Sequence, residues 1–186
     1  MIEEFDSSAA KVARAVGYVP RFAIVTLAIM FLLVGCAAQL SPSYNQAIFD
    51  DLTGLNVKTE TLFASLSHDS SVGDFASRRT TYDELIGSFS AAKLTTEARD
   101  VPPMGLRIAA SPALKGICGS DPVQCANPTP HHLEKIIALL TAMRDAHERG
   151  GLTRFIVAGS DGTGGVKNQY ETDMNIILVF EAALQR

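Results

Sequence analysis

Residues 129–151, TPHHLEKIIALLTAMRDAHERGG, decide the fold of this chain. Thr129-Pro130 is typical of a helix start, because a proline in the first turn has no amide hydrogen to leave unpaired. Apolar residues then recur every three or four positions, and Gly150-Gly151 is typical of a helix end. The apolar positions are Leu133, Ile136, Ile137, Leu140 and Met143. This spacing predicts an amphipathic helix with one face in a hydrophobic core.

Two helices with the same periodicity are expected before this one. The first is predicted to begin at the cap and proline Ser41-Pro42 and to end before the polar stretch 67–73. Its apolar positions are Ile48, Leu52, Leu55, Thr59, Leu62 and Leu66. The second is predicted to begin at the cap Asp74 and to end before Pro102-Pro103, since proline does not continue a helix. Its apolar positions are Phe75, Tyr82, Leu85, Ile86 and Phe89.

A fourth helix is expected near the C-terminus, and its start is ambiguous. Its apolar positions are Val166, Tyr170, Met174, Ile177, Leu178 and Leu184. A seven-residue spacing links Ile156, Thr163 and Tyr170, which fits one continuous helix from about residue 152 onward. The glycines of the stretch 159–165 oppose this, because each costs about 1 kcal/mol inside a helix. We therefore favour a break in that stretch.

Four amphipathic helices without a strand pattern predict an all-α protein, specifically an antiparallel four-helix bundle. The links 67–73 and 150–152 are short, so the helices that they join are expected to be antiparallel neighbours. Residues 100–128 form instead a long, Pro- and Gly-containing loop between the second and third helices, with a short helix expected over 111–116. Loops of this length in compact domains are frequently functional.

The N-terminal residues have a different character. Residues 22–34 contain no charge and follow the basic residues Lys11, Arg14 and Arg21. This apolar run has the length of a signal-peptide core and is shorter than the roughly 20 residues of a membrane-spanning helix. The run ends in Leu33-Val34-Gly35-Cys36, which resembles the lipobox of a bacterial lipoprotein signal. The resemblance implies that residues 1–35 are a signal peptide, that Cys36 is the lipid-attachment residue, and that 36–186 is the helical domain.

A bacterial lipoprotein is held in the cell envelope and faces the periplasm, and two acyl chains give durable anchoring. The residue after Cys36 is Ala37 rather than the aspartate that favours inner-membrane retention, so the outer membrane is favoured. The alternative is an uncleaved N-terminal anchor with Cys36 as an ordinary cysteine. Glu3, Glu4 and Asp6 balance the basic residues before the apolar run, which leaves the true translation start open.

Charge and cysteine content narrow the function of residues 36–186. The whole chain has a net charge of −4, and the first 35 residues contribute none of it. This charge, with no basic cluster, argues against nucleic-acid binding. Cys118 and Cys125 are expected to form a disulfide, as is usual outside the cytoplasm. Closing that short loop would stabilise the fold by about 2.5 kcal/mol. A zinc site would require further thiolates or histidines at close spacing.

No segment of the sequence matches the residue pattern of a known catalytic or cofactor-binding motif. His131 and His132 are weak candidates for metal binding, because a ferritin-type site needs Glu-x-x-His on two helices. The glycine-rich stretch 159–165 lacks the lysine and hydroxyl residue of a phosphate loop. Arg78 or Arg79 could pair with Asp173, although extension of the arginine to the surface is the simpler account. No cofactor is expected.

The sequence therefore predicts an envelope lipoprotein that binds or scaffolds another envelope component, most plausibly a protein, and is not an enzyme. The loop 104–126 and the start of the third helix are the first surfaces to test. One alternative is a carrier that holds a small ligand or metal in a groove between helices, and an enzyme is the third reading.

Overall fold

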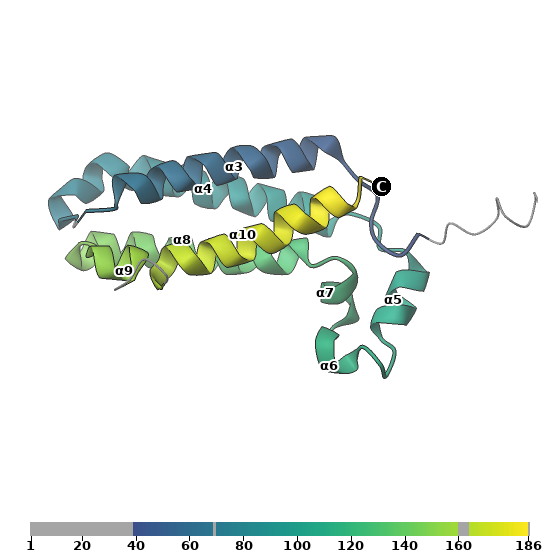
Figure 1. Ribbon diagram of the computed structural model, residues 1–186. Helices are drawn as coiled ribbons and strands as arrows, with labels where there is room; N and C mark the ends of the chain where they lie inside the picture. The colour runs from purple at the N-terminus through teal and green to yellow at the C-terminus, as the bar shows by residue number, and fades with distance from the viewer. Residues whose placement is uncertain (1–38, 69, 160–163, 186) are drawn as a thin grey trace, which may run out of the picture. The chain divides into compact units, whose positions relative to one another are not determined.

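The computed structural model describes residues 39–68, 70–159 and 164–185, and it is all-helical over these ranges (Figure 1). The long helices are α3 (Gln46–Ser65), α4 (Val72–Glu97), α8 (Thr129–Gly150) and α10 (Gly165–Ala183). The short helices are α5 (Pro103–Ala109), α6 (Lys115–Cys118), α7 (Pro122–Ala126) and α9 (Arg154–Ala158). No strand occurs in the described ranges, so the predicted all-α class is confirmed.

The long helices share one hydrophobic core, and the predicted apolar stripes supply it. Helix α4 packs against both α3 and α8, while α10 packs against both α8 and α3. All six predicted apolar positions of the first helix are buried, as are four of five in α4, four of five in α8 and three of six in the last helix. Tyr170 of α10 contacts the rings of Phe63 and Phe89, with ring centroids 5.3 and 6.4 Å apart. The periodicity in the sequence therefore identified the core faces correctly.

The predicted start of the first helix is wrong by a few residues. Helix α3 begins at Gln46, and its N-cap is Asn45 rather than Ser41. The side chain of Asn45 accepts hydrogen bonds from the amides of Ala47 and Ile48, at 3.0 and 3.4 Å. Asparagine supplies the same kind of acceptor as serine at an N-cap. Residues 39–45 consequently remain non-helical, and Pro42 is buried outside the helix.

The predicted cap of the second helix is also wrong. Helix α4 begins after Ser71, and Asp74 is its third residue. The Asp74 carboxylate accepts hydrogen bonds from the Ser71 amide at 2.8 Å and from the Ser71 hydroxyl at 2.9 Å. The acidic side chain thus reaches back to the cap residue, as in a capping box.

The favoured break before the fourth helix is confirmed. Gly159, just after α9, and Gly165, the first residue of α10, both have φ of +76°, a left-handed conformation that interrupts a helix and that glycine adopts without strain. Ile156 is 45 % exposed although it keeps the phase of α10, so α9 does not extend the buried face of that helix. The single continuous helix is therefore excluded. Residues 160–163 lie outside the described residues, as do Cys36 and the apolar run 22–34.

The segment between α4 and α8 is more ordered than the predicted loop. It contains α5, α6 and α7, rather than one helix over 111–116. Figure 1 shows these short helices grouped beside one end of the long helices. We call residues 100–128 the lobe.

The opposite end of the long helices is closed by two backbone hydrogen bonds. Ser70, in the α3–α4 link, donates to the Leu152 carbonyl at 2.7 Å and accepts from the Leu152 amide at 2.8 Å. Gly151 precedes this bridge with φ of +76°, and a β-carbon there would collide with the Ser70 carbonyl oxygen. The bridge therefore joins the link between α3 and α4 to the link that follows α8. Among the described helices, none is long and apolar enough to cross a membrane.

Candidate functional site

A buried ion pair fastens the lobe to the long helices. Arg99 follows the last turn of α4 and donates to both carboxylate oxygens of Glu181 on α10, at 2.7 and 2.8 Å. The Arg99 side chain is 10 % exposed and that of Glu181 is fully buried. Thr129, the first residue of α8, donates its hydroxyl to the same carboxylate at 2.5 Å. A two-point arginine–carboxylate pair is both strong and geometrically specific, so it fixes where the lobe leaves α4.

The same network holds the other end of the lobe. Asn127 accepts a hydrogen bond from Arg99 at 2.9 Å and donates one to the backbone carbonyl of Thr96 at 3.0 Å. Both Asn127 and Thr96 are buried. The chain therefore leaves the long helices near residue 99 and returns near residue 127 at one shared anchoring point.

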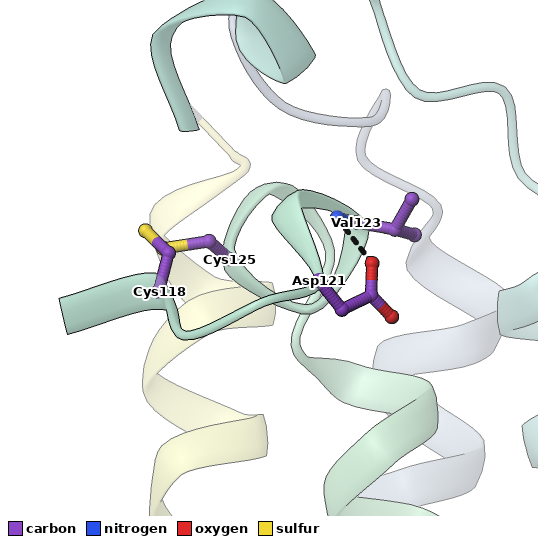
Figure 2. The surroundings of a disulfide bond; sticks show 4 residues. All are labelled: Cys118, Asp121, Val123 and Cys125. Carbon is purple, nitrogen blue, oxygen red and sulfur yellow. Dashed lines mark hydrogen bonds between the residues drawn. A yellow bond between two sulfur atoms is a disulfide. The ribbon is translucent and has the colours of Figure 1, made fainter. Parts of the chain in front are cut away.

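Within the lobe, the predicted disulfide between Cys118 and Cys125 is confirmed. It joins the end of α6 to α7, with the two Cα atoms 5.2 Å apart, an ordinary separation for a disulfide. Asp121 lies between the cysteines and caps α7 by accepting from the Val123 amide at 2.9 Å. Figure 2 shows the disulfide on one side of this turn and the Val123 side chain on the other. The disulfide and the cap together order a polypeptide that buries little of its own surface.

The ordered lobe exposes large apolar side chains. Ile117 is 81 % exposed, the highest value among the large apolar residues that the structure describes. The other exposed apolar residues of the lobe are Met104, Ile108 and Val123, at 43–48 %. Met104 and Ile108 are four residues apart on α5 and therefore share a face of that helix. The six exposed apolar residues outside the lobe and its adjoining N-terminal segment are distributed over α3, α4, α9 and α10.

The N-terminal segment of the described chain crosses the lobe. The Leu40 carbonyl lies against Gly105 of α5, so closely that a β-carbon at Gly105 would collide with it. Gly105 is buried by this contact, while the Leu40 side chain is 44 % exposed. In Figure 1 the chain that leads into α3 passes the end of α5. Leu40 therefore adds a further apolar side chain at the surface of the lobe.

The weak metal candidates His131 and His132 make the following contacts in the described structure. His132 lies on the first turn of α8, and its Nδ1 is 2.6 Å from a carboxylate oxygen of Asp173 on α10. Lys135 donates to the same oxygen at 3.1 Å. His131 makes a ring contact with His132, their centroids 5.5 Å apart. The described residues contain no group of three or more histidine, cysteine or acidic side chains placed to hold a metal ion.

The conceivable pair between Arg78 or Arg79 and Asp173 is not formed in the described structure. Arg78 donates instead to the Ser65 carbonyl at 3.2 Å, and Arg79 faces Asp83 at 3.9 Å in an exposed pair. The Arg78 contact adds a hydrogen bond at the C-terminal end of α3, where backbone carbonyls lack helical partners.

A buried histidine lies at the end of α8 away from the lobe. The Nδ1 atom of His147 is 3.2 Å from the Tyr82 hydroxyl, and its Nε2 atom is 3.2 Å from the Ser71 carbonyl. Because a carbonyl only accepts, Nε2 carries the hydrogen and Nδ1 accepts from Tyr82. Burial lowers the pKa of His147, and the positive charge of Arg78 adds to this lowering. The hydrogen bond to Ser71 and the Asp74 carboxylate oppose it.

Sequence reasoning missed both Glu181 and His147, although a signal for each exists. Glu181 lies four residues after Ile177, and His147 lies four residues after Met143. Each is therefore a polar residue in phase with an apolar stripe, which places it on the buried face. A buried polar residue requires a hydrogen-bonding partner, and this requirement predicts a network at both positions.

No protein family, no curated protein and no solved structure matches the chain.

Proposed function

We propose that this protein is a lipid-anchored, non-enzymatic binding or scaffolding protein of the bacterial cell envelope. In this proposal the long helices are an antiparallel four-helix bundle, and the lobe is the loop that carries the contact surface. The observation that carries the proposal is the exposure of Met104, Ile108, Ile117 and Val123 on a lobe held by a disulfide. Exposed apolar side chains gathered on an ordered surface are typical of an interaction site.

The fastening of the lobe supports the same interpretation. The Arg99–Glu181 pair removes two charges from water, which costs several kcal/mol before their attraction is counted. Held in this way, the lobe presents its apolar residues with little ordering left to occur on binding, which favours affinity.

The proposed location rests on two independent features of the chain. The stretch Leu33-Val34-Gly35-Cys36 resembles a lipobox, so Cys36 is the proposed lipid-attachment residue. The Cys118–Cys125 disulfide is of the kind that persists in an oxidising compartment such as the periplasm. Anchoring in the outer membrane is favoured because Ala37 follows the cysteine.

Intact mass measurement of the full-length protein tests the anchor. The protein is expressed in a bacterial envelope and extracted in mild detergent. The expected mass begins at Cys36, includes acyl chains, and lacks the two hydrogens removed by the disulfide. An unprocessed and unmodified chain would contradict the proposal.

Photo-crosslinking in intact cells tests the contact surface. A photoreactive residue is placed at Ile117 on the lobe and, as a control, at Val179 on α10, which is 60 % exposed. Crosslinks to an envelope component are expected from position 117 and not from position 179. Equal labelling from both positions would remove the lobe from the proposal.

The alternative is a carrier of a small ligand, and one groove of about 400 Å³ between α3 and α4 could serve it. Its lining includes Asp50, Asp51 and Lys58, so its occupant would be polar. A stoichiometric small molecule in the native mass of the extracted protein, lost on substitution of Lys58, would favour the carrier over the scaffold.

A further inference from the structure

The position of the proposed anchor relative to the lobe limits what the lobe can contact. Cys36 precedes Gln39 by three residues, and an extended chain spans at most about 3.6 Å per residue. An acylated Cys36 would therefore lie within about 11 Å of Gln39. Since Leu40 packs against Gly105, this short tether begins at the lobe.

The lobe carries no net charge, whereas the whole chain is acidic. Residues 100–128 contain Asp100, Arg107, Lys115 and Asp121 as their charged residues, so they carry no net charge, whereas the chain has a net charge of −4. Arg107 and Lys115 are both exposed, and the Asp121 carboxylate caps α7. An anionic surface would therefore repel the remainder of the protein but not the lobe, whose exposed Arg107 and Lys115 could face anionic headgroups.

Apolar side chains beside basic residues are the composition of surfaces that lie in the membrane interface. Ile117 and Val123 supply the apolar part in the disulfide-bonded half of the lobe, and Met104 and Ile108 supply it on α5. Each of these residues lies on the part of the molecule that the short tether would hold near the membrane.

We propose that the lobe rests on the lipid bilayer that holds the acylated Cys36. Ile117 and Val123 contact the lipid, while Arg107 and Lys115 face anionic headgroups. This inference rests on the proposed lipid anchor and names the component that the lobe binds. Helix α4 leads away from the lobe for 26 residues, about 39 Å, so its start at Val72 lies far from the lobe.

The chain contains no tryptophan, so one introduced tryptophan is a unique fluorescent reporter. Val123→Trp reports on the lobe and Val72→Trp on the far end. These valines are a matched pair, because they are 47 % and 49 % exposed and both lie in the first turn of a helix. Each full-length variant is purified in acylated form and reconstituted into phosphatidylethanolamine–phosphatidylglycerol vesicles that contain a brominated lipid as quencher. Circular dichroism verifies that each variant keeps its helices.

We expect blue-shifted emission and at least twofold stronger quenching by the brominated lipid for Val123→Trp than for Val72→Trp. Equal quenching of the two variants would overturn the inference while leaving the anchor intact. A second result would also overturn it: a tryptophan at position 123 whose emission shows it shielded from water in native membranes but fully exposed in the vesicles. A protein partner, rather than lipid, would then cover the lobe. A mass without acyl chains at Cys36 would overturn the proposed function, and this inference with it.

Discussion

Arg99 and Glu181 are separated by 82 residues in the sequence, yet the guanidinium of one donates to both carboxylate oxygens of the other. The pair connects the end of α4 with the last turns of α10, and Thr129 brings the start of α8 to the same carboxylate. Three of the long helices therefore meet at one buried charge, at the point where the lobe begins.

Substituting one partner of this pair is expected to destabilise the fold strongly. Glu181→Gln leaves the Arg99 guanidinium buried without its counter-charge, so the free energy of unfolding should fall by about 3–5 kcal/mol. Chemical denaturation measures this change. Arg79→Met removes an exposed arginine whose partner Asp83 is 3.9 Å away, and it should change stability by less than about 1 kcal/mol. If both substitutions lowered the free energy of unfolding by similar amounts, the buried network would not contribute more to stability than an exposed ion pair.

The disulfide is expected to stabilise the lobe more than the long helices. Cys118→Ser combined with Cys125→Ser removes a constraint worth about 2.5 kcal/mol in the chain-entropy description. Amide hydrogen exchange should therefore accelerate over residues 104–126, while the core amides of α4 and α8 retain their protection. Acceleration spread evenly through α4 and α8 would instead indicate that the lobe and the long helices unfold as one unit.

Stability is expected to decrease with falling pH because of His147. Its pKa is lowered in the folded state by burial, so the unfolded state binds more protons between that lowered pKa and the ordinary value near 6.5. The resulting stability is fully present above about pH 6.5 and is lost as the pH falls through the folded-state pKa. Denaturation midpoints measured from pH 7.5 to pH 4.5 follow this loss.

Two substitutions separate the titration of His147 from its hydrogen bond. His147→Gln removes the titrating group and should flatten the pH dependence in this window. Tyr82→Phe removes the hydrogen bond to Nδ1, costs about 1 kcal/mol, and should leave the pH dependence in place. An unchanged pH profile in His147→Gln would assign the acid sensitivity to other groups.

Two glycine-to-alanine substitutions should have opposite effects. Gly105→Ala places a methyl group against the Leu40 carbonyl, so it should lower stability and release residues 39–44 to proteolysis. Gly87→Ala lies inside α4 with no atom near the new methyl group, and it should raise stability by about 0.5–1 kcal/mol. Thermal unfolding measures the change in stability of both variants, and limited proteolysis detects the release of residues 39–44. Stabilisation by Gly105→Ala would show that the N-terminal segment does not pack on α5.

The helical positions that bury apolar side chains could be predicted because their spacing directly reflects the geometry of an amphipathic helix. The residues at which helices begin were harder to predict, because each start offers two suitable caps close together in the sequence. The first pair is Ser41 and Asn45, and the second is Ser71 and Asp74. Tertiary contacts decided between them. Asn45 rather than Ser41 caps α3, and Leu40 before it packs against Gly105 of the lobe, while Ser71 caps α4 directly after Ser70, which pairs with Leu152.

The sequence predicted where the candidate site lies and which cysteines form its disulfide. It did not predict the helices of the site. Proline and glycine at residues 102–119 indicated a loop, whereas the chain forms α5, α6 and α7. Short helices of four to seven residues have too little periodicity to be recognised, and their stability comes from neighbours rather than propensity. The Arg99–Glu181 pair was missed because pairing across distant helices has no local signature.

The bridge between Ser70 and Leu152 has a consequence for the order in which the protein assembles. The two hydrogen bonds bring together residues that are separated by α4, the lobe and α8. Closing such a long loop costs conformational entropy before the contacts between its ends form. Because a polypeptide is synthesised from its N-terminus, α3 and α4 can pair before Leu152 exists. Assembly can then proceed from α3 toward the C-terminus. Glu181, among the last residues to be made, completes the structure by joining α10 to Arg99 and Thr129.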